Sequence, residues 1–111
     1  MERPWGNYYK LHQEPGVWVK RIEVKPGARL SLQKHAKRSE KWIVVYGKGV
    51  ATVNDKEIHL EQGTVVDVPV GSVHRLTNNG QDVLILIEVA CGSYLAEDDI
   101  TRLQDDYQRA T

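Results

Sequence analysis

The sequence predicts an all-β protein built from antiparallel strands, and two features of the chain carry this prediction. Short segments of alternating or β-branched residues recur at close and regular spacing along the 111 residues. Gly, Pro and Asn residues that favour turns separate these segments. The pattern is typical of an antiparallel sandwich or barrel. The sequence has no internal repeat or low-complexity segment, so we expect a single domain.

The alternation of apolar and polar residues places the strands along the chain. We expect strands at residues 17–24, 29–35, 40–46, 50–53, 56–60, 64–68 and 82–90. Residues 1–16 are expected to form an N-terminal arm along an edge of the sheet, 17–91 the barrel and 92–111 a C-terminal tail. In that tail, Ile100, Leu103 and Tyr107 fit either a short helix or a docked extended segment.

The composition of single segments refines this expectation. Residues 64–68 are rich in β-branched side chains and residues 82–90 are apolar on both faces, so we expect two buried strands, the second of them central. Asn54-Asp55 is a two-residue hairpin signal between neighbouring strands. Cys91 is expected to be a small apolar packing residue.

Charge and cysteine content limit the classes of function. The chain has 15 basic and 15 acidic residues and no net charge, so electrostatics do not favour nucleic acid as a partner. A single cysteine excludes an internal disulfide. The N-terminus lacks a signal-peptide pattern, and the apolar run 83–87 is too short to cross a bilayer. We therefore expect a cytoplasmic protein without a membrane partner.

Four side chains with metal-binding atoms are spaced so that strands can bring them together. Gln33 and His35 are two residues apart, so both leave the same face of a strand. Glu40 and His74 can join them if the chain folds back in antiparallel strands. Two imidazoles, a carboxylate and an amide oxygen form a site for one divalent ion, such as zinc, manganese, iron, nickel or cobalt.

The interior of the expected barrel also receives a lysine. Lys20 shares a strand face with Trp18, Ile22 and Val24, so it is expected to point inward. A buried lysine needs a partner or a place at the wall of a pocket. His12 and His59 have no comparable spacing and are expected at the surface.

The spacing of the candidate ligands carries a family resemblance. The pattern G-x5-[H]-x-H-x4-E-x6-G over residues 27–47, then G-x5-P-x-G-x2-H-x3-N over residues 63–78, resembles the paired motifs of the cupin superfamily. Every position matches except Gln33, which stands in the place of the first histidine. The runs SLQKH (31–35) and RSEKWIVV (38–45) resemble the cupin module of type II phosphomannose isomerases. So do the flanking runs RPWG (3–6), VKRI (19–22), HRL (74–76), LIEV (86–89) and YLAEDDI (94–100).

The resemblance implies a double-stranded β-helix, or jelly roll, and an isomerase of a phosphorylated sugar. The implied substrates are mannose 6-phosphate and fructose 6-phosphate. Such an aldose–ketose isomerisation passes through an enediol, whose negative charge a divalent metal with open positions can stabilise. Only Glu40 among the four candidate ligands is anionic, so the site keeps the net positive charge that suits an enediolate.

This chemistry also needs cations for the phosphate and a base for the proton. The predicted substrate-binding residues are Lys20, Arg29 and Lys37. The predicted catalytic residues are Glu88, Glu97, Asp98 and Arg102. A solvated surface charge is the alternative for Arg29 and Arg102. The carboxylates that could supply the base are Glu88, Glu97, Asp98 and Asp99, and the sequence does not tell which of them faces the metal.

Four positions depart from the family pattern. Lys37 and Lys41 stand where histidines are usual, and Ala96 and Gln108 stand where glycines are usual. The two lysines lie close to Glu40 in the sequence. They either strengthen phosphate binding or indicate a different sugar.

Two alternative functions and a homodimer are also expected from the sequence. A non-catalytic cupin that binds metal and sugar is the first alternative, and an iron(II) oxygenase is the second, because two histidines and a carboxylate can activate oxygen. Gln33 as a fourth ligand argues against the oxygenase. A homodimer is expected because Trp5, Tyr8 and Tyr9 would otherwise leave aromatic surface exposed on the N-terminal arm.

Overall fold

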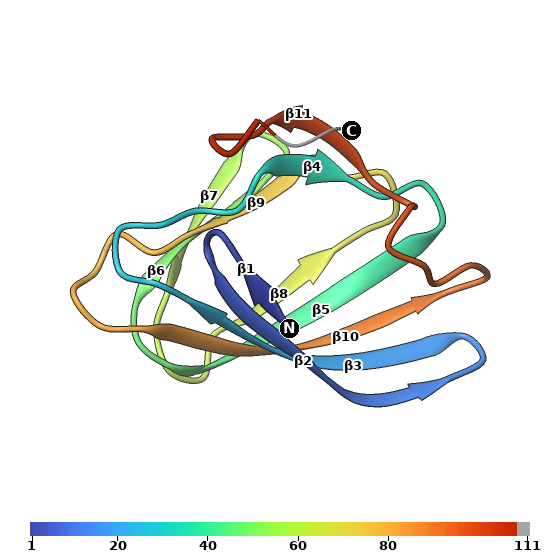
Figure 1. Cartoon of the computed structure of the whole chain (residues 1–111), viewed down its shortest axis with the longest axis horizontal. Coiled ribbons are helices and arrows are strands. Elements are labelled where there is room, and N and C mark those ends of the chain that lie inside the picture. The colour runs from blue at the N-terminus through green and yellow to red at the C-terminus, as the bar shows by residue number, and fades with distance from the viewer. Residues whose placement is uncertain (109–111) are drawn as a thin grey trace.

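The computed structural model describes residues 1–108, and every regular element in this range is a β-strand. The strands form two antiparallel sheets that face each other around a common core (Figure 1). The larger sheet contains, in spatial order, β1 (Glu2–Arg3), β2 (Gly6–Glu14), β3 (Val17–Val24), β10 (Leu84–Gly92), β5 (Arg38–Tyr46) and β8 (Val65–Val68). The smaller sheet contains β11 (Thr101–Gln104), β4 (Leu32–Lys34), β9 (His74–Thr77), β6 (Gly49–Val53) and β7 (Lys56–Leu60). This is the all-β jelly roll that the sequence predicted.

The inner face of the larger sheet shows how alternation builds both core and site. Along β3, Trp18, Lys20, Ile22 and Val24 are buried, and the residues between them are partly exposed. The prediction that Lys20 points inward is confirmed, since the residue is only 5% exposed. Strand β10 lies between β3 and β5, which confirms the expected central strand.

Two expectations about buried residues are wrong, and both errors concern the outer face of the larger sheet. The side chains of β8 alternate between the core and the outer face of the sheet, so Val66 is buried, whereas Val65 is 60% exposed. The strand predicted to be buried at residues 64–68 is therefore buried on one face only. Cys91 is exposed because its neighbour Ala90 occupies the inner face of β10.

Both ends of the chain extend the sheets. Strand β2 pairs with β3 and confirms that the N-terminal segment lies along a sheet edge. The tail forms β11, which pairs with β4, so the extended alternative holds and the helix does not. Residues 109–111 of the expected tail lie outside the described residues. The expected strand 29–35 is shorter than predicted, because its regular part is β4 and Arg29 forms only an isolated bridge with Thr77.

Turn residues fix the points at which the chain changes direction. Asn54 has a φ of 53° between β6 and β7, a left-handed conformation that asparagine tolerates, and the predicted hairpin is present. Gly47 has a φ of 90° directly after β5. A Cβ at Gly47 would also clash with the carbonyl of Val83, so this end of the ligand-bearing strand requires glycine.

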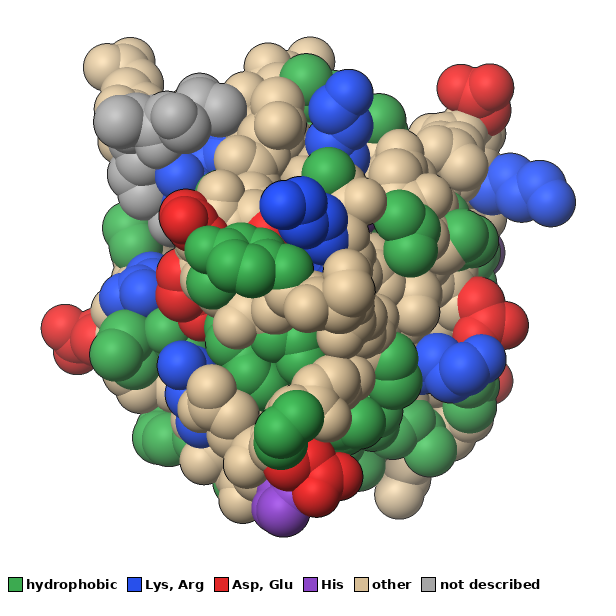
Figure 2. All heavy atoms as spheres, turned by 90° about the vertical axis from the view of Figure 1, so that its right-hand side faces the viewer, with side chains coloured by type: hydrophobic (Ala, Val, Ile, Leu, Met, Phe, Trp, Pro, Cys, Tyr) green, Lys and Arg blue, Asp and Glu red, His purple; other side chains and the backbone are tan. Residues whose placement is uncertain are grey.

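The surface of the described residues mixes both signs of charge with apolar side chains. Figure 2 shows basic, acidic and hydrophobic groups interspersed on the end of the molecule that it faces. No helix in residues 1–108 is long and apolar enough to span a membrane. The cytoplasmic location stays a prediction.

Two of the three aromatic residues behind the expected homodimer are buried in their own chain. Trp5 and Tyr8 are each 6% exposed and pack into the core of their own chain. Tyr9 is 43% exposed, so the expected aromatic surface on the N-terminal arm is reduced to this residue. Further exposed apolar side chains lie on β5 and β8, where Ile43 faces Val65 across the strand pair. The homodimer stays a prediction.

Candidate metal centre

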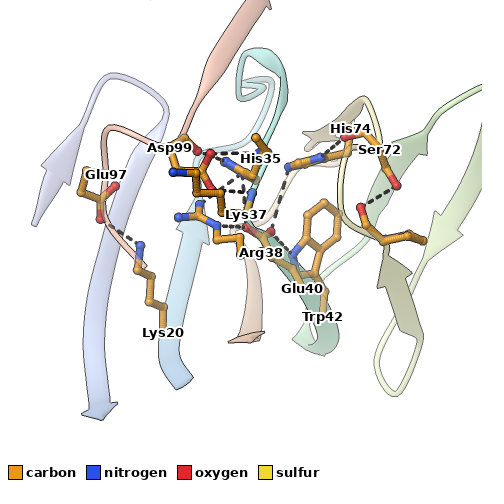
Figure 3. A network of polar contacts seen from close by, with 12 residues as sticks. Lys20, His35, Lys37, Arg38, Glu40, Trp42, Ser72, His74, Glu97 and Asp99 are labelled. Atoms are coloured by element: carbon orange, nitrogen blue, oxygen red, sulfur yellow. Dashed lines mark hydrogen bonds and ion pairs between the residues drawn. The ribbon is translucent and has the colours of Figure 1, made fainter. Parts of the chain in front are cut away.

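Three of the four predicted metal ligands meet inside the barrel (Figure 3). Glu40 comes from β5 of the larger sheet, His74 from β9 of the smaller sheet, and His35 from the turn between β4 and β5. Their ligand atoms lie within 4.8 Å of one another, and all three residues are buried. Glu40 Oε2 is 3.3 Å from His35 Nε2, and Glu40 Oε1 is 4.0 Å from His74 Nε2.

Backbone carbonyl groups set the orientation of both imidazole rings. His35 Nδ1 lies 2.6 Å from the carbonyl oxygen of Asp99, and His74 Nδ1 lies 3.0 Å from that of Ser72. A carbonyl oxygen only accepts hydrogen bonds, so each neutral ring carries its proton on Nδ1. Each Nε2 then carries no proton and directs its lone pair into the space beside Glu40. Histidines that bind a metal through one ring nitrogen commonly donate the N–H of the other nitrogen to such an acceptor.

The Glu40 carboxylate is held by donors from its own strand. Trp42 Nε1 donates to Oε1 at 3.0 Å, and Arg38 Nε donates to Oε2 at 2.9 Å. Arg38 Nη2 also lies 3.1 Å from His35 Nε2, where it donates to the ring lone pair. That lone pair is the one a metal ion would use. Arg38, Glu40 and Trp42 share the inner face of β5 because they are two residues apart.

The protonation states suit a divalent cation. Burial lowers the pKa of His35 and of His74, so both rings tend to be neutral. Burial alone would raise the pKa of the Glu40 carboxyl, but the charges of His74, His35 and Arg38 outweigh it and bring the value to about 2. When both rings are neutral, Arg38 is the cation that remains paired with this carboxylate. Two neutral imidazoles and an ionised carboxylate fit a metal ion.

A cavity of about 90 Å³, with room for several water molecules, opens beside these three residues. The predicted residues that line it are Lys20, Gln33, Glu88, Glu97 and Arg102. Gln33 stands opposite His74 in the pairing of β4 with β9. It therefore lies on the same wall of the cavity as the candidate metal ligands, which we call the ligand wall. The cavity therefore combines the candidate metal ligands with cations and further carboxylates.

Two carboxylates at the cavity have pKa values shifted in opposite directions. Burial raises the pKa of Glu88 well above its ordinary value, and the charge of Glu40 raises it further. Burial would also raise the pKa of Glu97, but the charge and hydrogen bond of Lys20, at 3.0 Å, outweigh burial and lower it. Glu88 therefore favours its protonated form and Glu97 its ionised form.

Three other predicted site residues do not line this cavity. Arg29 forms a bidentate pair with Asp106 at 2.7 and 2.8 Å. Lys37 places its ammonium 5.0 Å from the centre of the Tyr94 ring. Asp98 accepts a hydrogen bond from the Tyr94 hydroxyl at 2.8 Å.

Sequence reasoning missed two residues of the site and gave a third another role. Arg38 contacts two candidate ligands and Arg3 lines the cavity, whereas Asp99, considered only as a possible base, orients His35. Alternation on β5 was a signal for Arg38, which stands two residues before Glu40. Arg3 and Asp99 lie within the flanking runs of the family resemblance. No local pattern indicated their direction.

Comparison with known sequences shows the family of this chain. Residues 1–105 match the family described as mannose-6-phosphate isomerase C-terminal. The alginate biosynthesis protein AlgA of Pseudomonas aeruginosa is 51% identical over 107 residues, which cover 96% of this chain and 22% of AlgA. The xanthan biosynthesis protein XanB of Xanthomonas campestris is 50% identical over 107 residues, which cover 96% of this chain and 23% of XanB. The chain thus spans less than a quarter of the length of these relatives.

Solved structures show the same fold. The capsular polysaccharide assembling protein CapF of Staphylococcus aureus superposes with a TM-score of 0.83 at 25% identity, over 94% of this chain and 32% of CapF. A Klebsiella pneumoniae protein with a double-stranded β-helix domain gives 0.76 at 17% identity, over 91% of this chain and 88% of that protein. Fold and sequence agree, and the chain belongs to the mannose-6-phosphate isomerase C-terminal family of cupins.

Proposed function

We propose that this chain is a metal-dependent isomerase domain that interconverts mannose 6-phosphate and fructose 6-phosphate through an enediol. The group of His35, Glu40 and His74 is the observation that carries the proposal. Both Nε2 lone pairs and an ionised carboxylate point into one space beside a cavity lined with cations. Membership of this family supports the sugar-phosphate class of substrate.

The proposed centre holds one divalent ion on His35, Glu40 and His74, with Gln33 as a fourth ligand. Such an ion would supply Lewis-acid stabilisation of charge on two adjacent sugar oxygens. Glu40 is the one anion in this ligand set, so the set and a divalent ion together keep a net positive charge. Arg38 adds a further positive charge at the same place. The resulting field favours an enediolate over a neutral sugar.

Glu97 and Glu88 are the proposed proton carriers because their environments separate their pKa values. Glu97, which Lys20 keeps ionised, is the proposed base that removes the proton from one carbon and returns it to the next. Glu88, which burial keeps protonated, is the proposed acid that gives its proton to the carbonyl oxygen and recovers one from the hydroxyl on the adjacent carbon, so that it ends the reaction protonated. Both line the cavity, whereas Asp98 does not.

The proposed phosphate contacts are cations at the cavity wall. Lys20, Arg3 and Arg102 line it, and two of them are arginines, whose planar groups match phosphate oxygens. Lys20 is held over the rings of Trp18 and Tyr8 at 4.4 and 4.8 Å, so its position is fixed before a sugar arrives. Fixed cations bind an anion with little ordering cost.

Removal of one imidazole should abolish most of the metal affinity. We expect His74→Ala to bind cobalt or zinc more than about 100-fold more weakly than wild type, because loss of an outer partner alone costs about 10–100-fold. His59→Ala is the matched control, since His59 is exposed and outside the site. Metal titrations of the three proteins measure this. Equal affinities for wild type and His74→Ala would contradict the proposed centre.

Metal affinity should depend on pH in a way that the buried rings determine. Burial lowers both histidine pKa values below the ordinary 6.5. Affinity should therefore stay flat between about pH 8 and about pH 6.5, and fall below that range as protons compete for Nε2.

The stability of the fold should depend on pH in the same direction as the metal affinity. The folded protein takes up fewer protons at these rings than the unfolded chain, so the free energy of unfolding falls as the pH falls through 6.5. Titrations and thermal unfolding over this range measure both effects. A loss of affinity that begins well above pH 6.5 would show that the rings are not held neutral.

The isomerase activity is tested by a coupled assay over a panel of sugar phosphates. Glu97→Gln should lower kcat by about 10²- to 10⁴-fold, the usual contribution of a general base. Asp98→Asn, which alters the neighbouring carboxylate outside the cavity, should leave kcat unchanged. Metal-loaded wild type that neither interconverts the two sugars nor exchanges solvent deuterium into them would refute the substrate assignment.

Two other outcomes would favour the alternative functions. Sugar binding without turnover would favour the non-catalytic binder, and metal-dependent oxygen consumption would favour the oxygenase.

A further inference from the structure

Asp99 lies in the segment between β10 and β11, yet it contacts the turn that carries His35 at three points (Figure 3). Its backbone carbonyl oxygen is 2.6 Å from His35 Nδ1. Its carboxylate accepts hydrogen bonds from the backbone N–H groups of Ala36 at 2.9 Å and Lys37 at 3.0 Å. One residue of the tail therefore holds both the backbone and the ring of this part of the site.

The carboxylate contacts determine where the carbonyl points. Each oxygen accepts from one of two consecutive N–H groups, an arrangement in which successive amides bind an anion. These two bonds fix Asp99 against the turn, and its own carbonyl oxygen is then directed at the His35 ring. The carbonyl selects the tautomer with the proton on Nδ1, which leaves the Nε2 lone pair towards Glu40 and His74.

The two histidines differ in how this selection is made. Ser72 orients His74 from only two residues away, just before the start of β9. Asp99 orients His35 from 64 residues away in the sequence. The tautomer of His35 therefore depends on how the tail folds back across the barrel, whereas that of His74 is set locally.

Neighbouring residues attach the same segment to the rest of the site. Ala96 accepts a hydrogen bond from Arg38 Nη1 at 3.4 Å, and Glu97 accepts one from Lys20 at 3.0 Å. Both partners, Arg38 and Lys20, line the cavity. Ala96, Glu97 and Asp99 thus all attach the tail segment to residues of the site.

We propose that Asp99 is a positioning residue of the metal centre, whose carboxylate holds the 35–37 turn so that its carbonyl keeps His35 in the ligating tautomer. The inference rests on the proposed metal centre for its functional meaning. Its structural content, the tautomer of His35, is independent of any metal. Asp99 itself is not a catalytic residue, because its contacts are with His35, Ala36 and Lys37.

The tautomer is measured by ¹⁵N NMR of the histidine rings in metal-free protein. Wild-type His35 should show the proton on Nδ1, and Asp99→Ala should show a mixture of tautomers. Asp99→Asn keeps one acceptor oxygen and should give an intermediate result. Asp98→Asn is the matched control, because it removes a carboxylate from the same segment without contact to residues 35–37. His74 serves as the internal reference and should not change in any variant.

Metal affinity and the cobalt absorption spectrum supply the second readout. Asp99→Ala should bind cobalt roughly 10- to 100-fold more weakly than Asp98→Asn and show a changed spectrum, as expected for loss of an outer partner. If Asp99→Ala fails to fold, Asp99→Asn decides the question by the same two measurements. A wild-type tautomer and wild-type affinity in the folded variant would overturn the inference. If wild type binds no cobalt, the metal centre fails, and the tautomer still decides the role of Asp99.

Discussion

The buried carboxylate of Glu40 is the constraint on which the interior of this barrel depends. An ionised group at 3% exposure is costly unless each oxygen has a hydrogen-bond donor and a cation stands nearby. Strand β5 supplies both from positions two residues away on the same face, with Arg38 on one side and Trp42 on the other. Burial raises the pKa of Glu88 on the neighbouring strand, and the charge of Glu40 raises it further. The ionised state of Glu40 thus helps to keep Glu88 protonated.

The ligand wall is assembled from both sheets and closed by the tail. Glu40 belongs to the larger sheet and His74 to the smaller, so the site exists only when the two sheets are packed together. Asp99 then fixes the ring of His35, and Glu97 fixes the ammonium of Lys20. The metal-binding and sugar-binding halves of the proposed centre therefore depend on the same short segment. This segment lies between the end of β10 and the start of β11.

Local periodicity explains which features the sequence could predict. Residues two apart on a strand share a face, so the inward direction of Lys20 followed from its own segment. Long-range contacts have no such signal: the bond between Asp99 and His35 depends on the path of the tail. The exposure of Val65 and Cys91 was missed because apolar composition does not tell which face of β8 or of β10 is turned away from the core. The pairing of Arg29 with Asp106 also arises only when the tail folds back.

Anomalous diffraction from crystals loaded with cobalt tests the central claim most directly, because it locates the ion without reference to activity. The account predicts one strong peak within bonding distance of His35 Nε2, His74 Nε2 and a Glu40 oxygen, with nitrogen ligands at about 2.0–2.1 Å as for zinc. It also predicts that Arg38 no longer donates to His35 Nε2 in that crystal. A peak only at exposed side chains such as His12 or Cys91, with the interior unchanged, would contradict it.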